Sequence, residues 1–288
     1  MFLGPFFLVS AYWKHHCSKI LWQTAQNFST HCSWDGNELI NDDGHCLSIV
    51  LIVNKFHLFF DLDRTLWDFE KNSEIALNIL FHDLKLHLEI GDFQTFHDEY
   101  KEHNTILWKL YGTGKMTKEV LRSERFRKAL ATFDIDDPVI IDRLSDGYVE
   151  LSPLQTAMFP NAIETVKLLK SEGYELHMIT NGFREVQTIK IDNCGLAPYF
   201  QELICSEDIG KNKPDKDIFH YSMHLAGCKA YQSVMIGDDY EVDILGANAV
   251  GMHTIHFDPE EKFQDVKGEW RIRALNQIPE ILPWIFKG

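Results

Sequence analysis

The segment of residues 57–66 constrains the fold more strongly than any other part of the chain. Its apolar run, rich in phenylalanine, ends abruptly in two carboxylates one residue apart, Asp61 and Asp63. Such a run is typical of a strand buried on both faces of a parallel sheet. Because ligands bind beyond the carboxyl ends of such strands, we expect both carboxylates at a ligand crevice. Two carboxylates this close repel each other unless a proton or a cation lies between them.

The composition restricts the classes of partner. With 45% hydrophobic and 25% charged residues, the 288-residue chain matches an ordinary globular protein. Its net charge of −15 argues against a nucleic-acid polymer as partner, because such binding needs a basic surface. No apolar run reaches about 18 residues, so the sequence predicts no membrane span. The six cysteines are scattered without paired spacing, which favours reduced thiols and a cytoplasmic location.

Residues 1–54 differ in character from the rest. They begin with an apolar stretch that has no basic residue before it, a poor match to a secretory signal peptide. Three His-Cys pairs follow, but their wide intervals do not match the short gaps of known zinc modules. We therefore expect an atypical, poorly ordered N-terminal extension, and leave open whether it belongs to the native protein.

A long helical segment separates the first strand from the next. Apolar periodicity and helix-start residues predict helices over residues 74–86, 96–111, 139–150 and from about 117. One crossover between parallel strands needs far fewer residues. We therefore divide the remaining chain into a core, residues 55–70 and 155–288, and a helical cap, residues 71–154, inserted into it.

From residue 155 onward, strands and helices alternate. The predicted strands cover residues 174–180, 203–205, 233–236 and 254–257. The predicted helices cover residues 162–172, 185–194, 217–226, 243–250 and 275–285. Together with the first strand, this alternation predicts an α/β fold with a parallel sheet flanked by helices.

Four polar clusters lie at the ends of the expected strands or in the loops beside them. They are Asp61 with Asp63, Thr180-Asn181-Gly182, Lys213-Pro214-Asp215, and Gly237-Asp238-Asp239 with Asp243. Each alone has an ordinary explanation: a solvated strand end, a turn, a surface lysine and a helix N-cap. Their common place at strand ends favours one shared site, because the carboxyl ends of parallel strands lie at one edge of a sheet.

These clusters resemble the motifs of the haloacid dehalogenase (HAD) superfamily of phosphohydrolases. The resemblance rests on D-x-D-x-T at residues 61–65, Thr180, Lys213 and G-D-D-x-x-x-D at residues 237–243. It extends over residues 56–286 and implies a Rossmann-like HAD core, with a parallel sheet flanked by helices, plus an inserted all-helical cap. It also implies hydrolysis of phosphate monoesters with Mg²⁺ as cofactor.

The resemblance assigns the reaction steps to named residues. Asp61 would be the nucleophile that forms an aspartyl phosphate. Asp63 would protonate the leaving oxygen and then deprotonate the hydrolytic water. Mg²⁺ would be held by Asp61, the backbone carbonyl of Asp63, and Asp238. The presence of Asp63 favours a phosphatase over a dehalogenase, which needs no acid at that position.

The second and third motifs would contact the phosphate group. Thr180 and the amide of Asn181, with Gly182 beside them, would hold phosphate oxygens. Lys213 would neutralise the charge that develops in the transition state.

Two positions depart from the usual pattern. Arg64 stands where most relatives have glycine, so a positive φ there would cost about 1 kcal/mol. Asp239 stands where Ser or Thr is common, so the sequence leaves open which of Asp238 and Asp239 binds the metal. Asp243 would orient Lys213 or a metal-bound water.

One subgroup, the noncanonical pyrimidine nucleotidases, tolerates a charged residue at the position of Arg64. The chain resembles this subgroup in several aromatic residues that would stack on a base, namely Trp67, Trp108, Tyr111 and Phe183. Packing between cap and core explains each of these residues equally well.

We therefore predict an enzyme that hydrolyses a small phosphorylated metabolite, with a nucleoside 5′-monophosphate, in particular a pyrimidine nucleotide, as preferred substrate. A sugar-phosphate phosphatase or a phosphoglucomutase-like enzyme stays open, because these share all four motifs. A catalytically silent phospho-ligand-binding module is a more remote alternative, because binding alone has no use for both Asp61 and Asp63. The sequence does not determine the oligomeric state, and a homodimer stays open.

Overall fold

The computed structural model describes residues 32–34, 39–41, 55–262 and 270–286. The chain divides into two units, Met1–Val53 and Asn54–Gly288. In the first unit, β1 (Cys32–Trp34) and β2 (Leu39–Asn41) form an antiparallel pair. The expectation of a poorly ordered extension falls almost entirely on residues outside the described ranges, so it stays a prediction.

The second unit is built on a six-stranded sheet with the order β5-β4-β3-β6-β7-β8, in which every pairing is parallel. The strands are β3 (His57–Phe60), β4 (Glu175–Thr180), β5 (Phe200–Cys205), β6 (Ser233–Gly237), β7 (His253–Phe257) and β8 (Trp270–Ile272). From β3 the chain first builds outward on one side and then returns to β6 on the other. This is the Rossmann strand order, and its topological switch point lies between β3 and β6.

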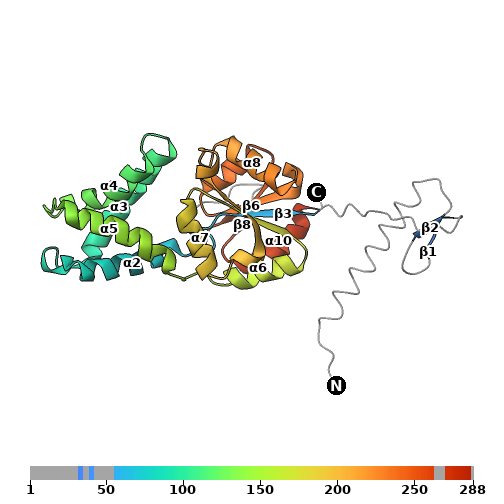
Figure 1. Ribbon diagram of the computed structural model, residues 1–288. Coiled ribbons are helices and arrows are strands. Elements are labelled where there is room, and N and C mark those ends of the chain that lie inside the picture. Colours follow the sequence, from blue (N-terminus) through green and yellow to red (C-terminus); the bar gives the residue numbers. More distant parts are fainter. Residues whose placement is uncertain (1–31, 35–38, 42–54, 263–269, 287–288) are drawn as a thin grey trace, which may run out of the picture. The chain divides into compact units, whose positions relative to one another are not determined.

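Helices cover both faces of this sheet (Figure 1). Successive side chains of β3 point to opposite faces, so Leu58 and Phe60 join one apolar cluster and Phe59 joins another. The first cluster packs against α6 (Ala162–Ser171) and α10 (Ile278–Ile285). The second packs against α8 (Lys216–Ala226) and α9 (Gly246–Asn248). The remaining core helix, α7 (Arg184–Asn193), follows β4. A strand buried on both faces was the central expectation from the sequence, and it is confirmed.

Four helices lie between β3 and α6 in the sequence and have an apolar core of their own. They are α2 (Phe69–Asp83), α3 (Phe93–Gly112), α4 (Lys118–Ala131) and α5 (Pro138–Leu151). Each starts at a side chain that accepts a hydrogen bond from a backbone N–H of the first turn, namely Asp68, Asp92, Thr117 and Asp137. The predicted fold, a Rossmann-like core with an inserted all-helical cap, is confirmed.

The described helices include none that is both long and apolar enough to cross a membrane.

Local differences from the predicted elements have identifiable causes. The helix predicted from residue 243 begins earlier, as a π-helical turn over Tyr240–Leu245, because Asp239 accepts hydrogen bonds from the N–H groups of Glu241 and Val242. The prediction missed β8, which has three residues and contains a charged arginine, so it carries almost no periodic signal. Arg64 has a φ of +67°, so the chain does require the positive φ for which relatives use glycine.

Candidate active site

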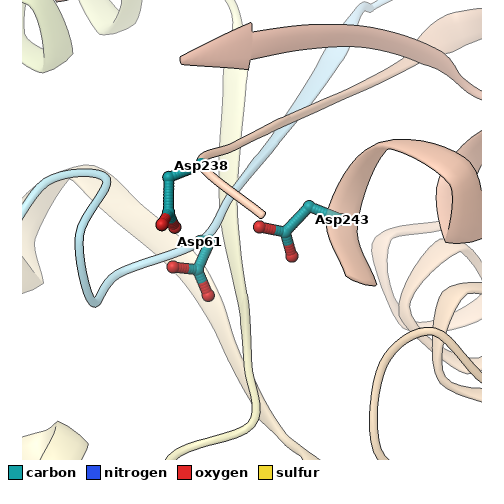
Figure 2. A group of neighbouring side chains, drawn as sticks. All are labelled: Asp61, Asp238 and Asp243. Carbon is teal, nitrogen blue, oxygen red and sulfur yellow. The ribbon is translucent and has the colours of Figure 1, made fainter. Parts of the chain in front are cut away.

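Three carboxylates gather at the switch point of the sheet. Asp61 follows β3, Asp238 follows β6, and Asp243 lies in the π-helical turn after β6. One oxygen from each of the three lies within 4.8 Å of the other two. Figure 2 shows the carboxylate groups of the three side chains lying close to one another. The fold therefore brings together acids that are far apart in the sequence, as the motif positions predict.

Lys213 lies among these carboxylates and is almost fully buried. Its Nζ is 2.6 Å from Asp61 Oδ1 and 2.6 Å from Asp243 Oδ1. It also donates to the carbonyl oxygen of Ile179 at 2.8 Å. Three oxygens thus surround the ammonium group: those of Asp61 and Ile179 accept hydrogen bonds, and that of Asp243 forms an ion pair. Burial alone would lower the pKa of Lys213, but Asp243 and Asp61 raise it above its usual value, so the lysine stays charged.

The electrostatics of the three acids favour a cation. Burial raises the pKa of Asp61 to about 7, although the charge of Lys213 opposes the rise. Burial and the charge of Asp61 also raise the pKa of Asp238 well above its usual value, and burial raises that of Asp243. All three therefore resist ionisation together; Lys213 relieves this cost at Asp61 and Asp243, and a second positive charge beside Asp61 and Asp238 would relieve the rest. Clustered carboxylate oxygens are the donors that Mg²⁺ prefers, so the residues present fit this ion.

The two neighbouring acids of the last motif have different surroundings. Asp238 belongs to the carboxylate group and accepts a hydrogen bond from Thr65 Oγ1 at 3.3 Å. Asp239 is engaged as the helix cap described above. The geometry therefore supports Asp238, rather than Asp239, as the metal ligand. Gly237 has no room for a side chain, because a Cβ there would lie 2.2 Å from Asp243 Oδ2.

Among the residues that the structure describes, the Thr180 hydroxyl accepts two hydrogen bonds and donates none. The backbone N–H of Gly182 donates to Thr180 Oγ1 at 3.0 Å, and Gln187 Nε2 donates to it at 2.6 Å. A hydroxyl that accepts two hydrogen bonds keeps its own proton for an external acceptor such as a phosphate oxygen.

Asn181 ties the second motif to the third. Its Oδ1 accepts from the backbone N–H of Lys213 at 2.8 Å, and its Nδ2 donates to the carbonyl oxygen of Lys213 at 3.0 Å. The side chain therefore fixes the loop that carries Lys213, and only the backbone amide of Asn181 stays a candidate for the predicted phosphate contact.

The carboxylate of Asp63 is outside the group of three and contacts helix α7 instead. Its Oδ1 is 2.5 Å from Lys190 Nζ, and its Oδ2 accepts from Gln187 Nε2 at 2.7 Å. Both partners are buried, and neither was predicted from the sequence. No motif marks them, and the available signal is their spacing of three residues on the helix after Thr180, which places them on one helix face.

The aromatic residues predicted to contact substrate pack against the protein. Trp67 is fully buried and lies beneath the ammonium group of Lys190, which is 3.9 Å from the ring centroid. Phe183 stacks on Trp108, with ring centroids 5.3 Å apart, and meets Tyr111 edge-on. These contacts support the alternative of cap–core packing, and a base could stack on Trp67 only if the ring left the core.

Comparison with known proteins places this site in a family. A family model described as haloacid dehalogenase-like hydrolase matches residues 57–251. The pyrimidine 5′-nucleotidase YjjG of Escherichia coli is 28% identical over 228 residues, which are 78% of this chain and 96% of that protein. The pyrimidine 5′-nucleotidase PynA of Streptococcus pneumoniae is 30% identical over 203 residues, 70% of this chain and 83% of that protein.

Other similar proteins are not named as nucleotidases. A glyceraldehyde 3-phosphate phosphatase of Methanothermobacter thermautotrophicus is 30% identical over 198 residues, 69% of this chain and 83% of that protein. Among solved structures, the HAD-hydrolase YfnB of Bacillus subtilis bound to magnesium matches with a TM-score of 0.71 and 27% identity, covering 80% of this chain and 99% of that one. The chain belongs to the haloacid dehalogenase-like hydrolase family.

Proposed function

We propose that this chain is a Mg²⁺-dependent phosphomonoester hydrolase that works through an aspartyl phosphate and prefers nucleoside 5′-monophosphates, pyrimidine nucleotides in particular. The observation that carries the proposal is the group formed by Asp61, Asp238, Asp243 and Lys213 at the switch point of the sheet. It combines a nucleophile, oxygen ligands for a cation and a buried positive charge. These are the parts that attack on an anionic phosphate requires.

In the first step Asp61 attacks phosphorus, so a bond forms between its carboxylate oxygen and phosphorus while the bond to the ester oxygen breaks. Asp63, in its protonated form, gives a proton to the departing oxygen. In the second step Asp63 takes a proton from water, which attacks phosphorus and releases Asp61 and inorganic phosphate. Thr180 and the backbone amide of Asn181 hold phosphate oxygens, and Lys213 balances the growing charge.

Asp61, the backbone carbonyl of Asp63, and Asp238 would hold the metal ion. When bound, Mg²⁺ screens the nucleophile and the phosphate from each other's negative charge. Asp243, through its ion pair, keeps Lys213 directed at Asp61.

The substrate preference is supported by the relatives. Two of the reported relatives have names that assign them to pyrimidine 5′-nucleotides. The similarity to a glyceraldehyde 3-phosphate phosphatase keeps a sugar phosphate as the second candidate. Both substrates use the same core chemistry, so the cap must select between them.

A screen of phosphate release with Mg²⁺ tests the proposal. The panel contains pyrimidine and purine 5′-monophosphates, sugar phosphates and p-nitrophenyl phosphate, each also tested with EDTA and with Asp61→Asn. We expect the highest kcat/KM for a pyrimidine nucleotide, no turnover by Asp61→Asn, and loss with EDTA that Mg²⁺ restores. Preference for a sugar phosphate would overturn the substrate assignment, and metal-independent turnover would overturn the mechanism. Binding without turnover would instead support a silent binding module.

A further inference from the structure

We infer that Lys190 and Gln187 are positioning residues for Asp63, which they hold in the place where it exchanges protons with the leaving group and with water. This inference rests on the proposed function and extends the site beyond the four motifs. Its basis is a contact that joins each oxygen of the Asp63 carboxylate to a different side chain of α7.

Gln187 links the proposed acid to the proposed phosphate-binding hydroxyl. Its single amide nitrogen donates to Asp63 Oδ2 at 2.7 Å and to Thr180 Oγ1 at 2.6 Å. In its ionised form, the one that takes a proton from water in the second step, Asp63 only accepts hydrogen bonds, so the nitrogen of the amide must face it. Glycine at position 182 makes this possible, since a Cβ there would lie 2.3 Å from Gln187 Nε2. Gln187 thus holds the proposed acid, Asp63, at a fixed distance from the proposed phosphate-binding hydroxyl of Thr180.

Lys190 fixes the other oxygen and is itself held in place. The residue is only 4% exposed, and its ammonium group lies between Asp63 Oδ1 and the face of Trp67. The indole is in turn anchored by a hydrogen bond from Nε1 to the carbonyl oxygen of Gln155 at 3.0 Å. A lysine on the surface would lose little by moving, whereas this one would lose its contact with the partly buried carboxylate of Asp63 and a cation–π contact. The arrangement therefore restricts how far Asp63 can rotate.

Such restriction matters because a proton donor must lie within hydrogen-bond reach of the leaving oxygen. A displacement of about 1 Å can cost about 100-fold in rate. The effect depends on the leaving group: a nucleoside or sugar oxygen needs a proton as it departs, whereas p-nitrophenolate leaves as a stable anion. Loss of a positioning residue for the acid should therefore harm alkyl esters and spare p-nitrophenyl phosphate.

The test compares kcat/KM for a pyrimidine 5′-monophosphate and for p-nitrophenyl phosphate, because kcat/KM reports on the steps through departure of the leaving group. We expect Lys190→Met to lower kcat/KM for the nucleotide by about 10- to 100-fold and to change it for p-nitrophenyl phosphate by less than about threefold. Gln187→Met also removes a hydrogen bond from Thr180, so it should lower kcat/KM for both esters, and that for the nucleotide by the larger factor. Lys190→Arg, which keeps the charge, should recover part of the loss for the nucleotide.

Lys170→Met is the matched control, because it also removes a lysine from an ion pair, with Glu175 at 3.0 Å, but at the opposite end of β4. It should leave kcat/KM unchanged for both esters. If Lys190→Met does not fold, as judged by thermal unfolding, Gln187→Met provides the test: its kcat/KM should fall more for the nucleotide than for p-nitrophenyl phosphate. An equal fall for both esters, or no fall for either, would overturn the positioning role while leaving the proposed function intact. Absence of wild-type turnover on both esters would overturn the proposed function, and this inference with it.

Discussion

The catalytic edge of the sheet and the contact between cap and core use charge in opposite ways. At the catalytic edge, formed by Asp61, Asp238, Asp243 and Lys213, the ammonium group and the two acids that it pairs with are almost fully buried. At the cap–core contact, Lys118 of α4 pairs with Glu185 and Glu207 of the core, and Arg122 of α4 pairs with Glu185, all at partly exposed positions.

The two regions therefore differ in the energy at stake. Removing one member of a buried ion pair leaves an uncompensated charge and costs about 3–5 kcal/mol. An exposed pair contributes about 0–1 kcal/mol, because water solvates either partner alone. The catalytic edge is consequently intolerant of change, whereas the cap–core contact can be modified or separated cheaply. This difference suits a family in which one core chemistry serves several substrates.

The largest effect that we expect from a single substitution, short of removing the nucleophile, is that of Asp63→Asn. The amide keeps the size of the side chain but can neither give a proton to the leaving oxygen nor take one from water. We expect kcat on a nucleotide to fall by about 10²–10⁴ with KM changed little. Steady-state kinetics measure both constants. A loss expressed in KM alone would place Asp63 in binding instead of proton transfer.

A second substitution tests how tightly the catalytic edge is packed. In Gly237→Ala the new methyl group would lie 2.2 Å from Asp243 Oδ2, so Asp243 must move and Lys213 with it. We expect kcat to fall by about 10- to 100-fold. Gly112→Ala in the cap is the matched control, because a Cβ there has no neighbour within 4 Å, and its activity should match wild type. Wild-type activity in Gly237→Ala would mean that the catalytic edge is as adaptable as the cap–core contact.

The catalytic edge was also the more predictable region. The strands, their parallel pairing and the convergence of Asp61, Thr180, Lys213 and Asp238 follow from local signals combined with one topological rule, that parallel strands end at one edge. Most helix boundaries agreed within a few residues, because caps such as Thr117 are encoded locally.

The contacts that the sequence did not reveal depend on side-chain geometry. Lys190 and Gln187 look like ordinary polar positions of an amphipathic helix, and only the packing of α7 shows that they face Asp63. Likewise, Trp67 is a residue type that often stacks on bases, but in this fold it is completely buried. A single sequence cannot distinguish an aromatic residue in the core from one in a ligand site, since both are apolar and adjoin motifs.

Acid should weaken the core more than the cap. Burial, followed by the charge of His57, lowers the pKa of His177 on β4 to about 4, against 6.5 in the unfolded chain, while Glu175 opposes the shift. Because the unfolded state binds the proton first, the stabilisation is complete above pH 6.5 and is lost as pH falls toward 4. We expect this histidine alone to cost about 3 kcal/mol in the free energy of unfolding by pH 4.

Urea unfolding at pH 7 and pH 4 measures this loss. His177→Gln, which can keep a hydrogen bond to His57 but does not titrate, should reduce the dependence on pH. His220→Gln, at an exposed position of α8, should not. If the free energy of unfolding depends on pH equally in His177→Gln and wild type, His177 is not the cause of the loss of stability in acid.

The smallest effect should come from the cap–core contact itself. Lys118 lies 2.7 Å from Glu207 and 2.8 Å from Glu185, and its ammonium group is 4.4 Å from the ring centroid of Phe183. Replacing both Lys118 and Arg122 by Met removes these pairs, which at their exposure are worth about 1–2 kcal/mol together. If the contact holds the cap over a bound nucleotide, KM for the nucleotide should rise about threefold to tenfold, and kcat/KM for p-nitrophenyl phosphate should change little.

Glu124→Gln provides the control for this pair, because its ion pairs with Arg127 and Lys128 lie within α4 and do not reach the core. Adding salt to the wild-type enzyme should also raise KM for the nucleotide, because salt screens exposed ion pairs far more than buried ones. A nucleotide KM that responds to salt in wild type but not in the double variant would assign the response to these residues. A fall in kcat for both esters would instead mean that the cap–core contact supports the chemistry directly, and the contrast between the two regions would disappear.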